Sequence, residues 1–185
     1  MKNFELLKQP LKRDQIDFKI AQVIKSNDSI YATILAYKDA RVDMQVLDDA
    51  VGQMNWQVTY QRDSKGILQC SIGIFNEEYL TWTWKTSNGT ESDFEAEKGE
   101  YSDAFKRAGF MWGIGRQLYD MPKIYVQLNE QDYYENEKDG KVKASPKLHP
   151  NSWKWTISED YKSITVERKL GGKYVEVYNS NPYNK

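Results

Sequence analysis

Three short runs in which apolar and polar residues alternate, between positions 56 and 84, constrain the fold of this chain more than any other feature. Alternation with a period of two places every second side chain on the same face of a strand. Turn-forming residues separate the runs at 63–66 and 76–78. We therefore predict an antiparallel three-stranded β-meander. The alternation is set by Trp56, Val58 and Tyr60, by residues 68–75, and by Leu80, Trp82 and Trp84.

The run after the meander predicts a long helix over residues 95–119. Its acidic first turns suit the positive end of a helix dipole, and Asp120-Met121-Pro122 ends it. When the helix is projected at about 100° per residue, one set of residues falls on a single stripe, and this stripe must pack on the sheet. The predicted fold class is α+β, a meander packed on a long helix, with a small C-terminal β-rich extension. The stripe consists of Tyr101, Phe105, Ala108, Trp112, Gly115 and Tyr119.

Two further helices are predicted before the meander. Residues 14–24 place apolar side chains at helical spacing and predict an amphipathic helix. Asp39 can cap another helix, which Gly52 closes. Residues 30–37, between them, predict a short strand or a buried connector.

The C-terminal third predicts short strands and a polar connection. Residues 123–128 read as one strand, and three more are expected at 153–157, 163–168 and 174–178. We predict three segments: a core over residues 1–128, a polar loop or linker over 129–150, and the β-rich extension over 151–185. Trp153, Trp155 and Tyr174 of the extension could stack on bases, although ordinary hairpin packing explains them better.

Composition removes several classes of active site. Cys70 is the single cysteine, so an internal disulfide and every multi-cysteine zinc site are excluded. His149 is the single histidine, so a histidine-pair metal site is excluded and a Ser-His-Asp triad could only be built on this residue. No apolar run approaches the length of a membrane span. We expect a soluble cytoplasmic protein, in the bacterial host's cytoplasm if a phage encodes it.

The charges of the long helix are segregated, although the net charge is only −1. Residues 91–103 are strongly acidic, whereas residues 106–123 carry four basic side chains against one acidic one. The side opposite the packing stripe holds Lys106 and Arg107 beside the apolar Phe110 and Ile114. A solvated pair of cations is the simpler interpretation, but a neighbouring subunit or a ligand on this side would explain the apolar residues. Glycines at 109, 113 and 115 weaken a helix by up to ~1 kcal/mol each and suggest that another backbone approaches closely.

Two motifs in this order resemble the Rad52 family of DNA annealing proteins. The first is YKDARV at 37–42 followed by GQMNW at 52–56, and the second is EKGEYSDAFKRA at 97–108. With WGIGRQLY at 112–119, the second motif is most similar to the bacteriophage, Sak-type branch. The resemblance covers about residues 30–125. Residues 126–185 match no motif of the family.

The resemblance implies a β-β-β-α core whose protomers assemble side by side into a ring or an open helical oligomer. Single-stranded DNA would lie in a positively charged groove, its phosphates held by Arg41, Lys106 and Arg107 so that the bases stay free to pair. Phe110 and Ile114 would then seat a neighbouring subunit or form the groove floor. We expect secondary phosphate contacts from Lys38, Lys85 and Lys98.

The implied function is annealing of complementary strands in recombination and repair, without catalysis. The sequence has no phosphate-binding loop for ATP, and we expect no cofactor and no metal. A host or phage single-strand binding protein is a candidate partner. One alternative is a non-catalytic adaptor that binds a protein. The other is a metal-dependent nuclease built on Asp39, Asp43, Glu91 and Glu95, although these acids also suit helix caps and dipoles.

Overall fold

The computed structural model describes residues 2–89 and 96–181, without the side chains of residues 96–98. The chain forms two compact units. Unit 1 comprises Met1–Gln15 and Lys38–Arg116, and unit 2 comprises Ile16–Tyr37 and Gln117–Lys185. The predicted α+β class is confirmed, and every strand pair in the described residues is antiparallel. The predicted division into three segments, with boundaries at 128 and 150, stays a prediction. Within the described residues no helix is long and apolar enough to cross a membrane.

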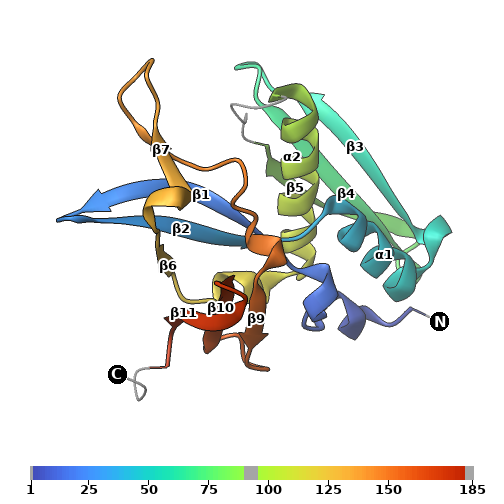
Figure 1. The fold of residues 1–185 in the computed structure, drawn as a ribbon. Helices are drawn as coiled ribbons and strands as arrows, with labels where there is room; N and C mark the ends of the chain where they lie inside the picture. Colours follow the sequence, from blue (N-terminus) through green and yellow to red (C-terminus); the bar gives the residue numbers. More distant parts are fainter. Residues whose placement is uncertain (1, 90–95, 182–185) are drawn as a thin grey trace. The chain divides into compact units, whose positions relative to one another are not determined.

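Unit 1 combines a three-stranded sheet with two α-helices (Figure 1). The strand order is β3-β4-β5. Three short 3-10 helices precede or connect these elements. In chain order the elements are η1 (Phe4–Lys8), η2 (Arg13–Gln15), α1 (Ala40–Val51), η3 (Gln53–Asn55), β3 (Trp56–Arg62), β4 (Leu68–Asn76), β5 (Thr81–Asn88) and α2 (Ala96–Trp112).

Helix α1 begins and ends where the sequence predicts. The side chain of Asp39 accepts a hydrogen bond from the backbone N–H of Arg41 and caps the helix, because the first N–H groups of a helix have no partner within it. Gly52, at φ +85°, is the C-cap residue at the other end of the helix. The buried side of α1 includes Leu47, Ala50 and Val51.

The core of unit 1 lies between α1, α2 and one face of the sheet. Alternate residues of the central strand β4 point into it, as the period of two predicts. Helix α2 contributes Ala104, Phe105 and Ala108, and the ring of Phe105 lies 6.2 Å from that of Trp56. At the N-terminal end of α2, buried Glu100 binds both guanidinium nitrogens of Arg62 on β3, at 2.7 and 3.1 Å. The other buried residues of this core are Leu7, Leu47, Ala50, Val51, Leu68, Cys70, Ile72, Ile74 and Ile114.

Helix α2 ends at Trp112, seven residues before the predicted end at Tyr119. Gly113 takes φ +112°, which favours glycine, and its N–H donates to the carbonyl of Phe110. The N–H of Ile114 donates to the carbonyl of Gly109 at 3.1 Å, which completes a Schellman motif. Ile114 thereby turns into the core, with 1% of its surface exposed. The expectation that Ile114 faces a groove or a neighbour is therefore wrong.

The predicted helix at residues 14–24 is also wrong, because residues 17–26 form strand β1 (Asp17–Ser26). β1 pairs with β2 (Ser29–Tyr37), which confirms the strand interpretation of residues 30–37. A bulge between Ile20 and Gln22 inserts one extra residue. Ile20 and Val23 lie opposite Ile34 and Ala32, which share one face of β2, and the extra residue makes them three positions apart instead of two. The bulge therefore imitates helical spacing in the sequence.

Unit 2 contains the sheets β1-β2-β6 and β11-β10-β9 and the hairpin β7-β8. The three predicted C-terminal strands and the strand near 123–128 are confirmed. The segment 129–150, predicted as a loop or linker, contains β7 and β8. The elements after α2 are η4 (Arg116–Tyr119), β6 (Ile124–Gln127), η5 (Glu130–Asp132), β7 (Tyr133–Glu135), β8 (Val142–Ala144), η6 (Pro150–Ser152), β9 (Lys154–Ile157), β10 (Ile164–Leu170) and β11 (Lys173–Asn179).

The tryptophans of the C-terminal segment pack inside unit 2. Trp155 is 7% exposed and stacks on Phe18 of β1, with ring centroids 3.6 Å apart. The backbone N–H of Phe18 donates to Asn151 at 2.6 Å. Trp153 lies under the guanidinium of Arg168, which forms a buried bidentate pair with Asp132. Packing, rather than base stacking, accounts for Trp153 and Trp155.

Candidate nucleic-acid interface

A buried ion pair lies where α1 meets α2. Lys38, just before α1, donates to both carboxylate oxygens of Asp43 in the first turn of that helix. Lys38 is 5% exposed and Asp43 is fully buried. Burial raises the pKa of Asp43 to about 6, against the opposing effect of the Lys38 ammonium, and burial also lowers the pKa of Lys38. Loss of either partner would leave the other charge buried without compensation.

Gly109 of α2 and Gly115, just after the helix, make room for this pair. A Cβ atom on Gly109 would overlap the carboxylate of Asp43, and a Cβ atom on Gly115 would lie 2.5 Å from Cε of Lys38. Gly113 instead faces the backbone of Leu7, where its Cβ would lie 3.3 Å from the carbonyl oxygen. The sequence predicts a close backbone at all three glycines. At Gly109 and Gly115 the neighbour is a buried, charged side chain.

Arg41 and Lys106 both act on the carboxylate of Asp39. Arg41 is 86% exposed in its side chain, and its Nε lies 2.9 Å from Oδ1 of Asp39. Hydrogen bonds from Arg41 lower the pKa of Asp39 to about 2, and the charge of Lys106 lowers it further. Lys106 also acts on Lys38 and Asp43. The first turn of α1 and the middle of α2 thus each contribute one predicted cation that acts on Asp39.

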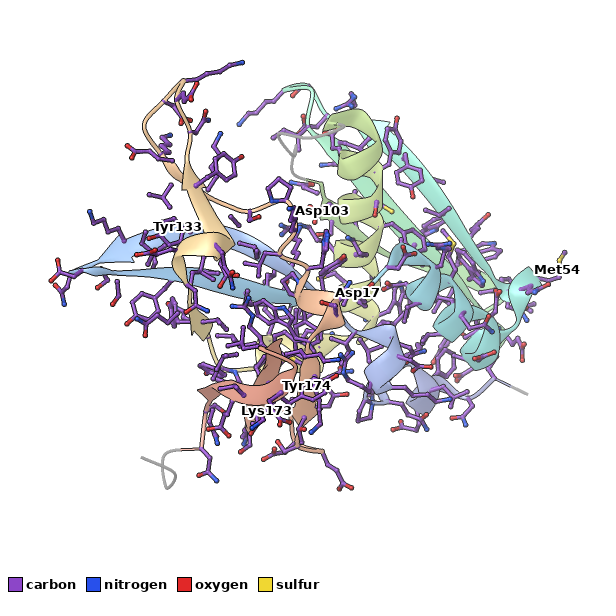
Figure 2. The ribbon with its side chains drawn as sticks, in the orientation of Figure 1. Asp17, Met54, Asp103, Tyr133, Lys173 and Tyr174 are labelled. Atoms are coloured by element: carbon purple, nitrogen blue, oxygen red, sulfur yellow. The ribbon has the colours of Figure 1, made fainter. Side chains whose placement is uncertain are left out.

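Arg107 extends this cationic surface along α2. Its Nε lies 2.7 Å from Oδ2 of Asp103, one helical turn earlier, and its side chain is 45% exposed. Figure 2 labels Asp103 on α2. Exposed pairs with this i, i+4 spacing contribute only about 0.3–0.5 kcal/mol. The guanidinium of Arg107 can therefore exchange Asp103 for another anion at little cost.

Lys85 lies at the C-terminal end of α2, where the backbone carbonyls have no partner within the helix. Its ammonium donates to the carbonyl of Met111 at 2.9 Å and lies 4.3 Å from the ring centroid of Trp112. Arg116 binds the carbonyls of Phe110 and Met111 at 3.0 and 3.1 Å. Burial, with a smaller effect of Arg116, lowers the pKa of Lys85. Both cations suit the negative end of the helix dipole.

The predicted cations thus occupy different environments. Arg41 at the start of α1 and Arg107 in the middle of α2 are exposed, and Lys106 beside Arg107 is half-buried. Lys38 is buried in its ion pair, and Lys85 caps α2. Lys98 lies in the first turn of α2, and its side chain is outside the described residues. Phe110 is half-buried, and the guanidinium of Arg116 lies 5.5 Å from its ring centroid.

Sequence reasoning missed the partners of these cations. It proposed Asp39 and Asp43 as metal ligands, whereas both bind cations of this chain. Glu91 and Glu95 lie outside the described residues. The signal for the buried pair was present as glycines within a helical run, but it did not show which side chains need the space. Among the described residues, no group of three His, Cys, Asp or Glu side chains could hold a metal ion.

Comparison with known proteins agrees with the two motifs. The model of the Rad52/22 family of double-strand break repair proteins matches residues 3–138, which include α1, the sheet and α2. The single-stranded DNA-binding protein DdrA of Deinococcus deserti is 31% identical over 131 residues. That match covers 67% of this chain and 60% of DdrA.

Proposed function

This chain belongs to the Rad52/22 family of double-strand break repair proteins, and on that basis we propose that it binds single-stranded DNA and anneals complementary strands. The observation that carries the proposal is the grouping of Arg41, Lys106 and Arg107 around the start of α1 and the middle of α2. The name of the similar protein DdrA, a single-stranded DNA-binding protein, supports the choice of ligand.

Phosphates are the part of the strand that these cations suit. Arg41 and Arg107 each hold an aspartate through exposed hydrogen bonds, and a phosphate can replace that carboxylate with the same donor geometry. Contacts to phosphates position a strand without reading its sequence. A strand held in this way keeps its bases available to a complementary strand, which is the requirement for annealing.

The buried Lys38–Asp43 pair has a supporting role in this proposal. The pair packs against Gly109 of α2, three residues after Lys106, and so joins the segment that carries Arg41 to α2. The spacing between the cations of the two helices thus depends on a contact in the core. Lys38 and Lys85 are assigned to that core contact and to the end of α2, and the phosphate contacts are assigned to Arg41, Lys106 and Arg107.

Annealing without ATP and assembly into a ring or an open helical oligomer complete the proposal. We further propose that sheet β3-β4-β5 with α2 corresponds to the β-β-β-α core that the family resemblance implies, and that it is the annealing core. A phage source, and a host or phage single-strand binding protein as partner, remain predictions from the motifs.

Two other functions receive less support. A nuclease would need free carboxylates, but Asp39 and Asp43 already bind Arg41 and Lys38. An adaptor for a protein partner would not need the exposed cations near the start of α1 and on α2. Salt distinguishes the adaptor from the DNA-binding protein, because binding to phosphates releases counterions and weakens as salt rises.

The test is an annealing assay with two complementary fluorescent oligonucleotides, without nucleotide or metal. We expect annealing to be faster with the protein than without it, and to slow as salt rises. Absence of any acceleration at low salt would refute the proposed function. Cleavage of a single labelled strand in Mg²⁺ would support the nuclease instead, provided that Asp39→Ala abolishes it.

A further inference from the structure

A hollow in unit 2 carries an excess of positive charge for which the proposed function has no use. It measures about 410 Å³, within the range of pockets that bind small ligands. All the residues that line it belong to unit 2 and to the described part of the chain. Three of them are the cations Lys147, Arg168 and Lys169, against the single acid Asp132. A concave surface with this balance of charge attracts an anion.

Arg168 provides a recessed guanidinium whose direction is fixed. Its side chain is only 8% exposed. The two terminal nitrogens donate to both carboxylate oxygens of Asp132, at 2.8 and 2.7 Å, and the guanidinium lies 5.0 Å from the ring centroid of Trp153. A guanidinium has five N–H donors, and within the described residues Arg168 uses two of them, both on Asp132. The other three have no hydrogen-bond partner there and are available to a ligand.

Asp132 holds this guanidinium in place and does not cancel the charge of the hollow. Burial would raise the pKa of Asp132, but hydrogen bonds from Arg168 and from the backbone N–H of Asn129 outweigh that effect, so the pKa lies below its ordinary value. The carboxylate is therefore ionised, and its oxygens are already occupied by donors. The charge of Arg168 is offset by Asp132, and the excess comes from the two lysines.

The segment between β8 and η6 adds donors to the same hollow. Lys147 and His149 line it and are exposed, and neither side chain forms a hydrogen bond or an ion pair with another described residue. The hydroxyl of Ser145 accepts the backbone N–H of Lys147 at 3.4 Å, and its own O–H is left to donate. Ammonium, imidazole and hydroxyl groups all donate to the oxygens of an anion.

The number of these donors and the depth of Arg168 select the anion. A terminal phosphate offers three acceptor oxygens and a charge of about −1.5 to −2 at pH 7, and arginine binds phosphate with two parallel hydrogen bonds. A phosphate that is linked on one side only can reach a recessed guanidinium, whereas a phosphodiester within a strand carries a sugar on each side. We propose that the hollow binds a terminal phosphate group, a phosphomonoester, at the end of a DNA strand or on a free nucleotide.

The test uses phosphate probes at constant ionic strength. Phosphorus NMR follows inorganic phosphate and deoxyadenosine monophosphate as protein is added, and wild type should broaden both resonances. Anisotropy compares one labelled single strand with a phosphate at the 5′ end, at the 3′ end or at neither end. Where strand ends are the source, one phosphorylated strand should bind about tenfold more tightly than the unphosphorylated strand, as one charge-assisted interaction predicts. Equal binding of the three strands, with broadening retained, identifies the free nucleotide as the source.

Lys147→Glu is the decisive variant, because Lys147 is exposed and its replacement should leave the fold intact, which circular dichroism checks. It should abolish the broadening and any preference for a phosphorylated strand. Lys173→Glu reverses the same charge at the exposed start of β11 (Figure 2) and should behave as wild type. Arg168→Lys keeps the charge but loses the planar fork, and it should weaken phosphate binding about tenfold.

The DNA-binding cations of unit 1 do not enter this inference. Lys106→Ala with Arg107→Ala should weaken binding of all three strands and leave the effect on inorganic phosphate unchanged, so the two proposals can fail separately. Loss of phosphate binding in Lys147→Glu but not in Lys173→Glu supports the inference. Absence of broadening with wild type, or equal broadening by wild type and a folded Lys147→Glu variant, would overturn it.

Discussion

Gly109 of α2 lies directly against the carboxylate of Asp43 of α1, with no room for a β-carbon between them. A glycine in the interior of a helix is unfavourable by about 1 kcal/mol relative to alanine. Here it allows the buried Lys38–Asp43 pair to lie between the two helices that carry Arg41 and Lys106. The geometry of the candidate interface thus depends on a residue that contacts no ligand.

Gly109→Ala should destabilise the protein although alanine is the better helix former. The added methyl group must displace Asp43 from Lys38, and overpacking of this kind costs about 1–3 kcal/mol. Urea unfolding followed by circular dichroism measures the change in the free energy of unfolding. In a Lys38→Met, Asp43→Ala background the same substitution should cost less, because the carboxylate is gone. Stabilisation by Gly109→Ala in the wild-type background would contradict the packing described.

Lys106→Ala combined with Arg107→Ala should abolish annealing while the fold and the oligomer survive. Each phosphate contact to a single strand contributes about 0.7 to the slope of log affinity against log salt, so the double variant should lose about 1.4. Anisotropy of a labelled oligonucleotide at several salt concentrations gives this slope. Lys138→Ala with Lys141→Ala removes the same charge from an exposed turn and is the control. Equal annealing by the double variant and wild type would show that the groove is misassigned.

Arg41→Ala should raise the pKa of Asp39 from about 2 towards its ordinary value of 3.8. Hydrogen bonds from Arg41 favour the ionised carboxylate, so the folded pKa lies below the unfolded one. The associated stability is present above pH 3.8 and is lost as the pH falls through about 2; it is small because the pair is exposed. Carboxyl-carbon NMR titration measures both midpoints. The capping bond from the backbone N–H of residue 41 remains, so the shift should be partial. An unchanged midpoint would mean that the Arg41 side chain does not bind Asp39 in solution.

Lys85→Met should lower stability without changing the DNA contact. The variant loses a hydrogen bond to the carbonyl of Met111 and the cation over Trp112, a combined effect on the order of 1 kcal/mol. Thermal unfolding measures this loss, and Lys85→Arg should recover part of it. The salt slope of oligonucleotide binding should stay at the wild-type value. A slope reduced as far as in Lys106→Ala would instead identify Lys85 as a phosphate contact.

The parts of the fold that the sequence predicted well depend on local interactions. Asp39 and Gly52 mark the ends of α1 because capping involves residues only a few positions apart. Strands β3, β4 and β5 follow from uninterrupted alternation. β1 was misread because its bulge adds one residue between Ile20 and Gln22, and a shift of one position turns strand spacing into apparent helical spacing.

The candidate site shows a similar division. The motifs predict Arg41, Lys106 and Arg107 together as phosphate contacts, and this role stays a prediction. In the structure Arg41 and Arg107 are exposed and Lys106 is half-buried. The burial of Lys38 could not be predicted, because it depends on Asp43 from the first turn of α1, on Gly109 of α2 and on Gly115 just after that helix. Contacts between segments so far apart in the chain leave no pattern in the spacing of a single sequence.

The pairing of β2 with β6 has a consequence for the order in which the chain folds during synthesis. Ile34 of β2 pairs with Ile124 of β6, so residues 35–123 separate these two neighbouring strands in the sequence. The β1-β2 hairpin leaves the ribosome early. Strand β6, which pairs with β2, and Trp155, which stacks on Phe18 of β1, are synthesised only after the last residue of unit 1. Unit 1 can therefore reach its native state while β1 and β2 still lack their contacts with β6 and Trp155. A nascent chain released before residue 124 would expose an apolar hairpin, the form most prone to aggregation and to proteolysis.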